Sequence, residues 1–288
     1  MTSASIQRAR GAGNNAKRSA GSAARIGLIG LGAVGRDVAA RLKTDQATVE
    51  VVALTRRVVA DANVDRFVKQ TTELIAVRPD LIVEAAGHGA VAEHVVPVLE
   101  AGIPVVLVSV GALADDRLRR RVMEAAQVGR AKLMFPGGAV GALDYIRAVS
   151  QVPDLRIRYC SRKPVAAWQQ ELIARGLSPD TLNCEVTLFE GSAREAALAY
   201  PQNLNVAMSL ALAGPGIEGV DVRVVADPKA TGNTHEIEIE SAAGRATLSF
   251  NNTPSPRNPK TSALTALSIV CAVRDHISVL DAADEPAA

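Results

Sequence analysis

His235 is the side chain of this sequence best suited to acid–base chemistry at neutral pH. It lies in the segment Gly232-Asn233-Thr234-His235-Glu236-Ile237, where polar and apolar residues begin to alternate as they do in a strand. An unperturbed imidazole changes charge between roughly pH 5 and 8, so histidine often serves as a general acid or base. Composition alone does not separate this role from that of a surface residue on a strand, so both interpretations stay open.

A lysine and two hydroxyls precede the last long apolar segment and suggest a carboxylate site. The segment reads Asn258-Pro259-Lys260-Thr261-Ser262 and lies directly before a predicted helix. Ammonium groups and the free N–H groups of a helix N-terminus both bind carboxylates. Lys260 taken alone is more often a charge that flanks a helix, so the prediction depends on its neighbours.

Residues 30–35 (GLGAVG) have the G-x-G-x-x-G pattern of a dinucleotide-binding turn. They follow a short apolar strand at 25–29 and precede a predicted helix at 36–43, as the pattern requires. The first glycine permits the tight turn, the second lets a pyrophosphate approach the backbone, and the third lets helix and strand pack closely. The alternative is a plain glycine-rich turn. We predict that a dinucleotide is bound here by Gly30, Gly32, Ala33, Val34 and Gly35.

The end of the second predicted strand bears on which dinucleotide binds. This strand covers residues 49–54 and is followed by Thr55, Arg56 and Arg57. A site that prefers NAD has Asp or Glu here to bind the ribose, whereas arginine can pair with the 2′-phosphate of NADP. We predict contacts from Thr55 and Arg56 and a site that accepts NADP, with NAD also usable. Alternatively, both arginines are solvated and the backbone and Thr55 hold the ribose.

The first half of the chain alternates strands and helices in the manner of a Rossmann fold. Further strands are predicted at 80–86, 104–110 and 132–135, and helices at 90–101 and 115–129. This alternation predicts right-handed crossovers and a doubly wound parallel sheet, which binds ligands at the carboxyl ends of its strands. Small, glycine-rich segments lie at those ends, at 86–89, 109–111 and 136–139. We expect Ala86, Gly87 and His88 to border the cofactor.

In the second half of the chain the predicted strands follow one another without a helix between each pair, which predicts an α+β domain with a mixed or antiparallel sheet. Strands are predicted at 156–161, 222–226, 235–241 and 245–250, and helices at 164–175, 201–213 and 262–279. Successive strands joined by turns such as Ala243-Gly244 do not form crossovers. The predicted domains are a disordered basic tail (1–24), a Rossmann dinucleotide-binding domain (25–140), a substrate and catalytic α+β domain (141–260), and a C-terminal helix with a short tail that packs back on the Rossmann domain (261–288).

Composition narrows the function to that of a two-domain cytoplasmic enzyme. The 288 residues carry a formal net charge of only +2, which gives no case for nucleic acid. Four of the 32 basic residues lie in the acid-free tail, which has no apolar core of its own. An untethered extension is favoured there over a transit peptide. The three cysteines and four histidines lack metal-ligand spacing, and no apolar run reaches the ~18 residues that span a bilayer. We expect no metal and no membrane.

The motifs taken together resemble the L-aspartate dehydrogenase family. They are the glycine loop, 135–144 (FPGGAVGALD), 203–207 (NLNVA), 226–228 (ADP), 233–237 (NTHEI) and 258–262 (NPKTS). The resemblance runs from about Arg25 to the final helix. It implies NAD(P)-dependent oxidative deamination of L-aspartate to iminoaspartate, which feeds NAD biosynthesis or hydrolyses to oxaloacetate and ammonia. It also implies a homodimer, which is the commonest oligomer.

The resemblance also implies roles for single residues. His235 corresponds to the active-site histidine, and Ala139 and Asn205 correspond to cofactor-binding positions. The two substrate carboxylates need cationic or N–H partners, for which Lys260, Thr261, Ser262 and Lys163 are the candidates. Lys163 is equally consistent with a solvated charge, and His88 is a rival for the acid–base role.

Two alternatives have different functions. The first is another Rossmann oxidoreductase of similar architecture, resembling homoserine dehydrogenase or dihydrodipicolinate reductase. The second is a sensor that binds NADP(H) without catalysis. A sensor has no need of an acid–base residue, so His235 and Lys260 within polar motifs argue against it. Formation of NAD(P)H with L-aspartate but not with homoserine would separate the first alternative from the favoured function.

Overall fold

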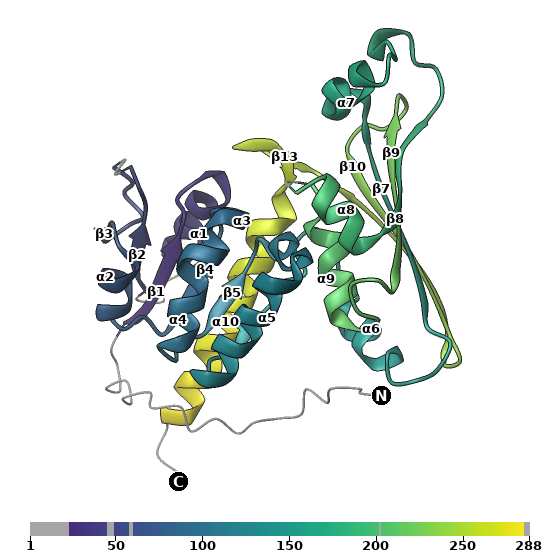
Figure 1. The fold of residues 1–288 in the computed structure, drawn as a ribbon. Helices are drawn as coiled ribbons and strands as arrows, with labels where there is room; N and C mark the ends of the chain where they lie inside the picture. Colours follow the sequence, from purple (N-terminus) through teal and green to yellow (C-terminus); the bar gives the residue numbers. More distant parts are fainter. Residues whose placement is uncertain (1–22, 45–48, 58–59, 202, 285–288) are drawn as a thin grey trace.

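The chain folds around two β-sheets that lie side by side, with helices between them (Figure 1). The structure is a computed structural model, and it describes residues 23–44, 49–57, 60–201 and 203–284. The basic tail predicted at 1–24 therefore lies outside the described residues, except for Ala23 and for Ala24, which already belongs to the first strand.

The first sheet is parallel throughout and has the strand order β3-β2-β1-β4-β5-β6. The order reverses between β1 and β4, which is the switch point where a Rossmann fold binds its ligand. The Rossmann prediction is confirmed. The elements are β1 (Ala24–Ile29), α1 (Ala33–Thr44), β2 (Val49–Leu54), β3 (Arg66–Val68), α2 (Thr71–Ala76), β4 (Leu81–Glu84), α3 (His88–Ala90), α4 (Val96–Glu100), β5 (Val105–Leu107), α5 (Asp116–Val128) and β6 (Leu133–Met134).

Local sequence signals explain how several of these elements begin. Asp115 caps α5, because its carboxylate accepts hydrogen bonds from the N–H groups of Arg117 and Leu118. The predicted helix at 90–101 is divided by a π-helical turn, Val91–Val95, between α3 and α4. The short elements β3 and α2 were not predicted, because three to six residues are too few to show a periodic pattern.

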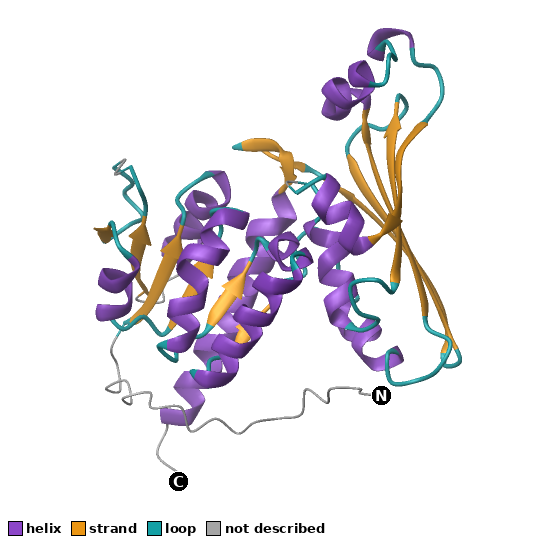
Figure 2. Cartoon of the chain, in the orientation of Figure 1, coloured by secondary structure: helices purple, strands orange, loops and turns teal. Residues whose placement is uncertain are grey.

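The second sheet is mixed, with the order β11-β10-β7-β9-β8, as the second half of the sequence predicted. Strand β7 pairs parallel with β9 and antiparallel with β10. Helices α6, α8 and α9 lie between this sheet and the Rossmann domain (Figure 2). The elements are α6 (Leu143–Val149), β7 (Arg156–Pro164), α7 (Gln169–Ala174), β8 (Val186–Ser192), α8 (Ala193–Ala199), α9 (Asn205–Ala213), β9 (Val220–Asp227), β10 (Asn233–Ser241) and β11 (Gly244–Asn252).

The C-terminal helix α10 (Ala263–Asp284) returns to the Rossmann domain after a small hairpin of β12 (Pro254–Ser255) and β13 (Asn258–Ser262). Its buried residues Ala266, Ile269, Val270 and Val273 share one apolar core with β1 and β2. By length and composition alone α10 is apolar enough to cross a membrane, although Arg274, Asp275 and His276 interrupt its apolar residues. One face of the helix is instead buried against the parallel sheet.

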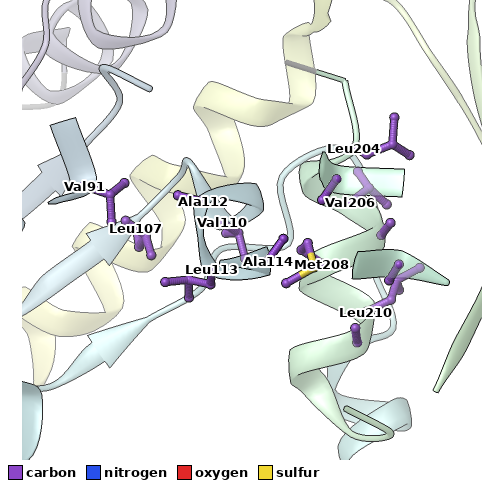
Figure 3. Close-up of a cluster of buried hydrophobic side chains, with 14 of the residues drawn as sticks. Val91, Leu107, Val110, Ala112, Leu113, Ala114, Leu204, Val206, Met208 and Leu210 are labelled. Carbon is purple, nitrogen blue, oxygen red and sulfur yellow. The ribbon is translucent and has the colours of Figure 1, made fainter. Parts of the chain in front are cut away.

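A larger apolar core joins the two halves of the molecule. Val110, Leu113 and their neighbours follow β5 in a 3-10 helical turn, Val110–Ala114, and pack with Leu204, Met208 and Leu210 around α9 (Figure 3). The labelled side chains come from both sides of the junction. This continuous packing fixes the carboxyl edge of the parallel sheet against the second domain, and the candidate site lies at that edge.

Candidate active site

A cavity of about 520 Å³ lies where the two halves meet. Its lining from the Rossmann side is formed by small residues at the ends of β4, β5 and β6, and its lining from the other side is polar. The predicted site residues that line it are Val34, Ala86, Gly87, His88, Ala139, Lys163, Asn205, His235, Thr261 and Ser262. Residues separated by more than 200 positions in sequence are thus brought to one place.

The glycine loop has the geometry that a pyrophosphate requires. Gly30 has φ of 92°, and a side chain there would collide with Ala86. A Cβ at Gly35 would lie 2.3 Å from the carbonyl oxygen of Gly30, so strand and helix pack too closely for any other residue. A Cβ at Gly32 would meet nothing within 4 Å, which leaves its backbone open to a ligand. The residues therefore fit a dinucleotide at the N-terminus of α1.

A second loop, at 136–139, is held in place from two directions. The N–H of Gly138 donates to the hydroxyl of Ser268 on α10 at 3.0 Å. The amide of Asn252 on β11 donates to the carbonyl of Ala139 at 2.7 Å. Both the C-terminal helix and the second sheet thus position the segment that carries Ala139 into the cavity.

His235 enters the cavity from β10 and is 5 % exposed. Its Nδ1 lies 2.7 Å from the hydroxyl of Tyr159, and the two rings stack with centroids 6.0 Å apart. This contact leaves Nε2 as the ring nitrogen available to a substrate. Burial, and next the charge of Lys163, lower the pKa of His235 to about 4, so the imidazole is neutral at pH 7.

Lys163, at the end of β7, is buried in the same cavity with 4 % exposure. Its Nζ donates to Oδ1 of Asn203 at 2.7 Å and lies 5.1 Å from the centroid of the Trp168 ring. An ammonium group held in this way is the charge that a carboxylate ligand would meet. Lys163 is not the solvated surface charge that was the alternative.

His88 and Asn205 lie together at the Rossmann side of the cavity. Oδ1 of Asn205 accepts the N–H of Gly111 at 2.8 Å, which links α9 to the loop after β5. His88 has its pKa lowered by burial, although its contact with Asn205 acts in the other direction. The Asn205 side chain therefore fixes the shape of the cofactor side as well as lining it.

The remaining predicted site residues are more dispersed. Thr55 follows β2 and bonds its own loop through the carbonyl of Arg57 at 2.9 Å, while Arg56 is exposed, and neither lines the cavity. Thr261 and Ser262 line the cavity from β13. The side chain of Lys260 lies outside the described residues.

Sequence reasoning did not select several residues that the structure brings into the site. Asn203, Ser209, Asn233 and Asn258 line the cavity, and Tyr159 supports His235 from behind. The three asparagines belong to the motifs at 203–207, 233–237 and 258–262. Tyr159 gave no signal, because its pairing with His235 depends on the register of β7 against β10. Within the described ranges, no three His, Cys, Asp or Glu side chains gather as a metal ion would require.

The fold and the site together define a two-domain oxidoreductase of the nicotinamide-dinucleotide class. The glycine loop lies at the switch point of a parallel sheet, and the cavity beside it joins an imidazole and an ammonium group. Comparison with known proteins agrees. Residues 30–136 match the family model for the homoserine dehydrogenase NAD binding domain, and residues 144–276 match the aspartate dehydrogenase C-terminal model.

Full-length relatives make the identification specific. L-aspartate dehydrogenase 2 of Bordetella bronchiseptica is 48 % identical over 259 residues, which cover 88 % of this chain and 97 % of the relative. L-aspartate dehydrogenase of Methanosarcina barkeri is 37 % identical over 268 residues, with the same coverage. The crystal structure of aspartate dehydrogenase from Thermotoga maritima superimposes with a TM-score of 0.71 at 27 % identity, covering 88 % of this chain and 97 % of that one. The chain belongs to the L-aspartate dehydrogenase family.

Proposed function

We propose that this protein catalyses the NAD(P)-dependent oxidative deamination of L-aspartate to iminoaspartate, which supplies NAD biosynthesis or hydrolyses to oxaloacetate and ammonia. The observation that carries the proposal is the pairing of buried His235 and buried Lys163 in one cavity beside the glycine-rich loops. Aspartate needs one base and a cationic environment for its carboxylates, and this cavity offers both.

The cofactor would lie along the carboxyl edge of the parallel sheet. The loop from Gly30 to Gly35 and the N-terminus of α1 would hold the pyrophosphate. The segment 86–88, Ala139 and Asn205 would border the nicotinamide. When bound, the oxidised nicotinamide accepts the hydride that leaves the aspartate Cα.

His235 is the base in this proposal. The substrate ammonium must lose a proton before its lone pair can assist hydride departure, and water must be activated to attack the resulting imine. Nε2 of a neutral imidazole can accept a proton in either step. The two carboxylates of aspartate would offset the charge of Lys163, which is the smaller of the two causes that lower the pKa of His235, after burial.

Lys163, Thr261 and Ser262 are the proposed carboxylate partners among the described side chains. Lys260, whose side chain is not described, is a further candidate from the sequence alone. The first three line the cavity. His88 is the weaker candidate for the base, because it lies on the cofactor side next to Asn205 rather than beside Lys163.

A panel of amino acids, assayed for NADH and NADPH formation, tests the reaction. L-aspartate is expected to give turnover, whereas D-aspartate and homoserine are not. His235→Ala is expected to lower turnover ~10²-fold or more and to leave cofactor binding unchanged. His94→Ala is the matched control, since His94 bonds Thr71 away from the cavity. Turnover of His235→Ala at the wild-type level would refute the assignment.

We further propose that NADP is the preferred cofactor and that Arg56 binds its 2′-phosphate. No carboxylate follows β2, where an NAD-specific site would have one, and Arg56 is exposed and accessible to a ligand. Arg56→Ser is expected to raise the KM for NADP roughly tenfold and to change that for NAD less than twofold, since a charge-assisted bond contributes about 1.5–3 kcal/mol. An equal effect on both cofactors would contradict this role.

The protein is also proposed to be a cytoplasmic homodimer without a nucleic-acid or membrane partner. Closed two-fold dimers are the commonest assemblies of soluble enzymes. Light scattering of the purified protein would measure the assembly directly, and a monomer mass would refute the dimer.

A further inference from the structure

Glu84 is a buried carboxyl group for which the proposed reaction has no use. It ends β4, is 0 % exposed, and among the described residues is the one buried Asp or Glu. No Lys, Arg or His of the described residues forms an ion pair with it, and the main causes that shift its pKa are burial and hydrogen bonds. A buried charge without a cation is costly, so its presence needs an explanation.

Four donors converge on the two carboxylate oxygens. Oε1 accepts the N–H groups of Ala86 at 2.8 Å and Gly87 at 3.0 Å and the hydroxyl of Ser109 at 2.9 Å. Oε2 accepts the N–H of Ser109 at 3.0 Å. The pKa of Glu84 is raised, because burial outweighs these hydrogen bonds, which act in the opposite direction. Three of the four donors are backbone N–H groups, which can donate a hydrogen bond but cannot accept one. The surroundings of Glu84 therefore suit a hydrogen-bond acceptor such as a carboxylate.

These donors form the cavity lining directly above Glu84. Ala86, Gly87 and Ser109 all line the cavity on the Rossmann side, where the nicotinamide would lie. Gly87 has φ of 109°, and its N–H donates to both Glu84 and the hydroxyl of Ser109. Only one layer of backbone therefore separates the carboxylate from the cavity.

The two states of the cofactor differ in charge at the ring that would occupy this place. The oxidised nicotinamide carries a positive charge, and the reduced ring is neutral. In a site with little water, charges interact over several ångströms without direct contact. A negative charge beneath the lining stabilises the oxidised ring and has little effect on the reduced one.

We propose that Glu84 is a positioning residue that shapes the nicotinamide site and whose negative charge makes the protein favour the oxidised cofactor over the reduced one. The proposal rests on the cofactor part of the proposed function and is independent of aspartate. It supplies the missing partner of Glu84, because the cation arrives with the cofactor.

The test compares dissociation constants of NADP⁺ and NADPH, or of NAD⁺ and NADH if NADP does not bind, measured by titration calorimetry. Glu84→Gln is expected to raise the ratio of the oxidised to the reduced dissociation constant by roughly tenfold. Glu50→Gln is the matched control, since Glu50 lies on β2 and pairs with Arg25 away from the cavity, and its ratio should equal that of wild type. Ser109→Ala keeps the charge of Glu84 but removes the hydrogen bond that the hydroxyl donates to Glu84 and the one that it accepts from Gly87, so both affinities should fall together.

Equal weakening of the two forms by Glu84→Gln would overturn the proposal and reduce Glu84 to a structural residue. If that variant does not fold, the proposal is tested on the wild-type protein. Its infrared difference spectrum is recorded between the complex with the oxidised cofactor and the complex with the reduced cofactor. A carboxylate band that shifts and resists exchange in deuterium oxide supports the proposal, and no such band overturns it. Failure of aspartate turnover would refute the proposed reaction but would not alter either cofactor measurement.

Discussion

The chemistry of His235 is set by its immediate neighbours. The Tyr159 hydroxyl occupies Nδ1, and burial next to Lys163 keeps the imidazole neutral. A histidine that stays neutral in the folded protein lowers the free energy of unfolding in acid, because its imidazole binds a proton more readily in the unfolded chain than in the folded one. His235 therefore links the active site to the pH dependence of folding.

This linkage predicts how stability changes with pH. The folded pKa of about 4 lies below the unfolded value of 6.5, so the contribution of His235 is intact above about pH 6.5 and is lost as pH falls towards 4. Between pH 7 and 5 wild type should lose about 2 kcal/mol more than His235→Gln. Urea unfolding of both proteins at the two pH values measures the difference. Equal losses would show that His235 titrates normally.

At the scale of elements, α10 is the segment that holds the Rossmann side of the site. It supplies the Ser268 hydroxyl to the 136–139 loop, and it is reached through β13, which carries Thr261 and Ser262. Its composition alone would also suit a membrane span. A helix that packs on a protein core has one face in apolar surroundings, whereas a membrane-spanning helix has its whole circumference in them.

Two substitutions on α10 test this placement. Ile269 is fully buried against β1 and β2, whereas Leu267 is 46 % exposed. Ile269→Ala should lower the free energy of unfolding by about 2–5 kcal/mol, because it opens a cavity in a packed core. Leu267→Ala should change it by less than about 0.5 kcal/mol. Chemical denaturation measures both, and similar values would contradict a one-sided packing of the helix.

The whole molecule behaves as one packed body in spite of its two sheets. The larger core runs from β4 and β5 through the 3-10 turn into α9 and on to the second sheet. The cavity lies at this junction, so a separation of the halves would destroy the site. The packing and the function depend on the same contacts.

A continuous core predicts a single unfolding transition. The one tryptophan, Trp168, is fully buried in the second domain, so its fluorescence reports that domain. Far-ultraviolet circular dichroism reports the helices of both. The two midpoints in urea are expected to coincide. Met208→Ala, at the junction, should shift both midpoints together, whereas separate transitions would show that the domains unfold independently.

The sequence predicted the Rossmann half well because its signals are local. The strands at 25–29 and 49–54 and the helix at 115–129 lie within a residue or a few of β1, β2 and α5. The strand β8 and the helices α6 and α8 were missed. Strand β8 is only partly buried and shows weak alternation, and α8 depends on a Ser192 and Glu195 capping box.

By itself, the sequence determined the glycine loop, the alternation of strands and helices, and the motifs around His235 and Asn258, because turn geometry and periodicity are properties of neighbouring residues. Only the tertiary structure decided that Lys163 is buried beside His235, that Tyr159 supports the imidazole, and that Glu84 lies beneath the cavity with hydrogen-bond donors but no cationic partner among the described residues. Burial and pairing depend on the register of strands and the packing of α9 and α10, which join residues far apart in the chain.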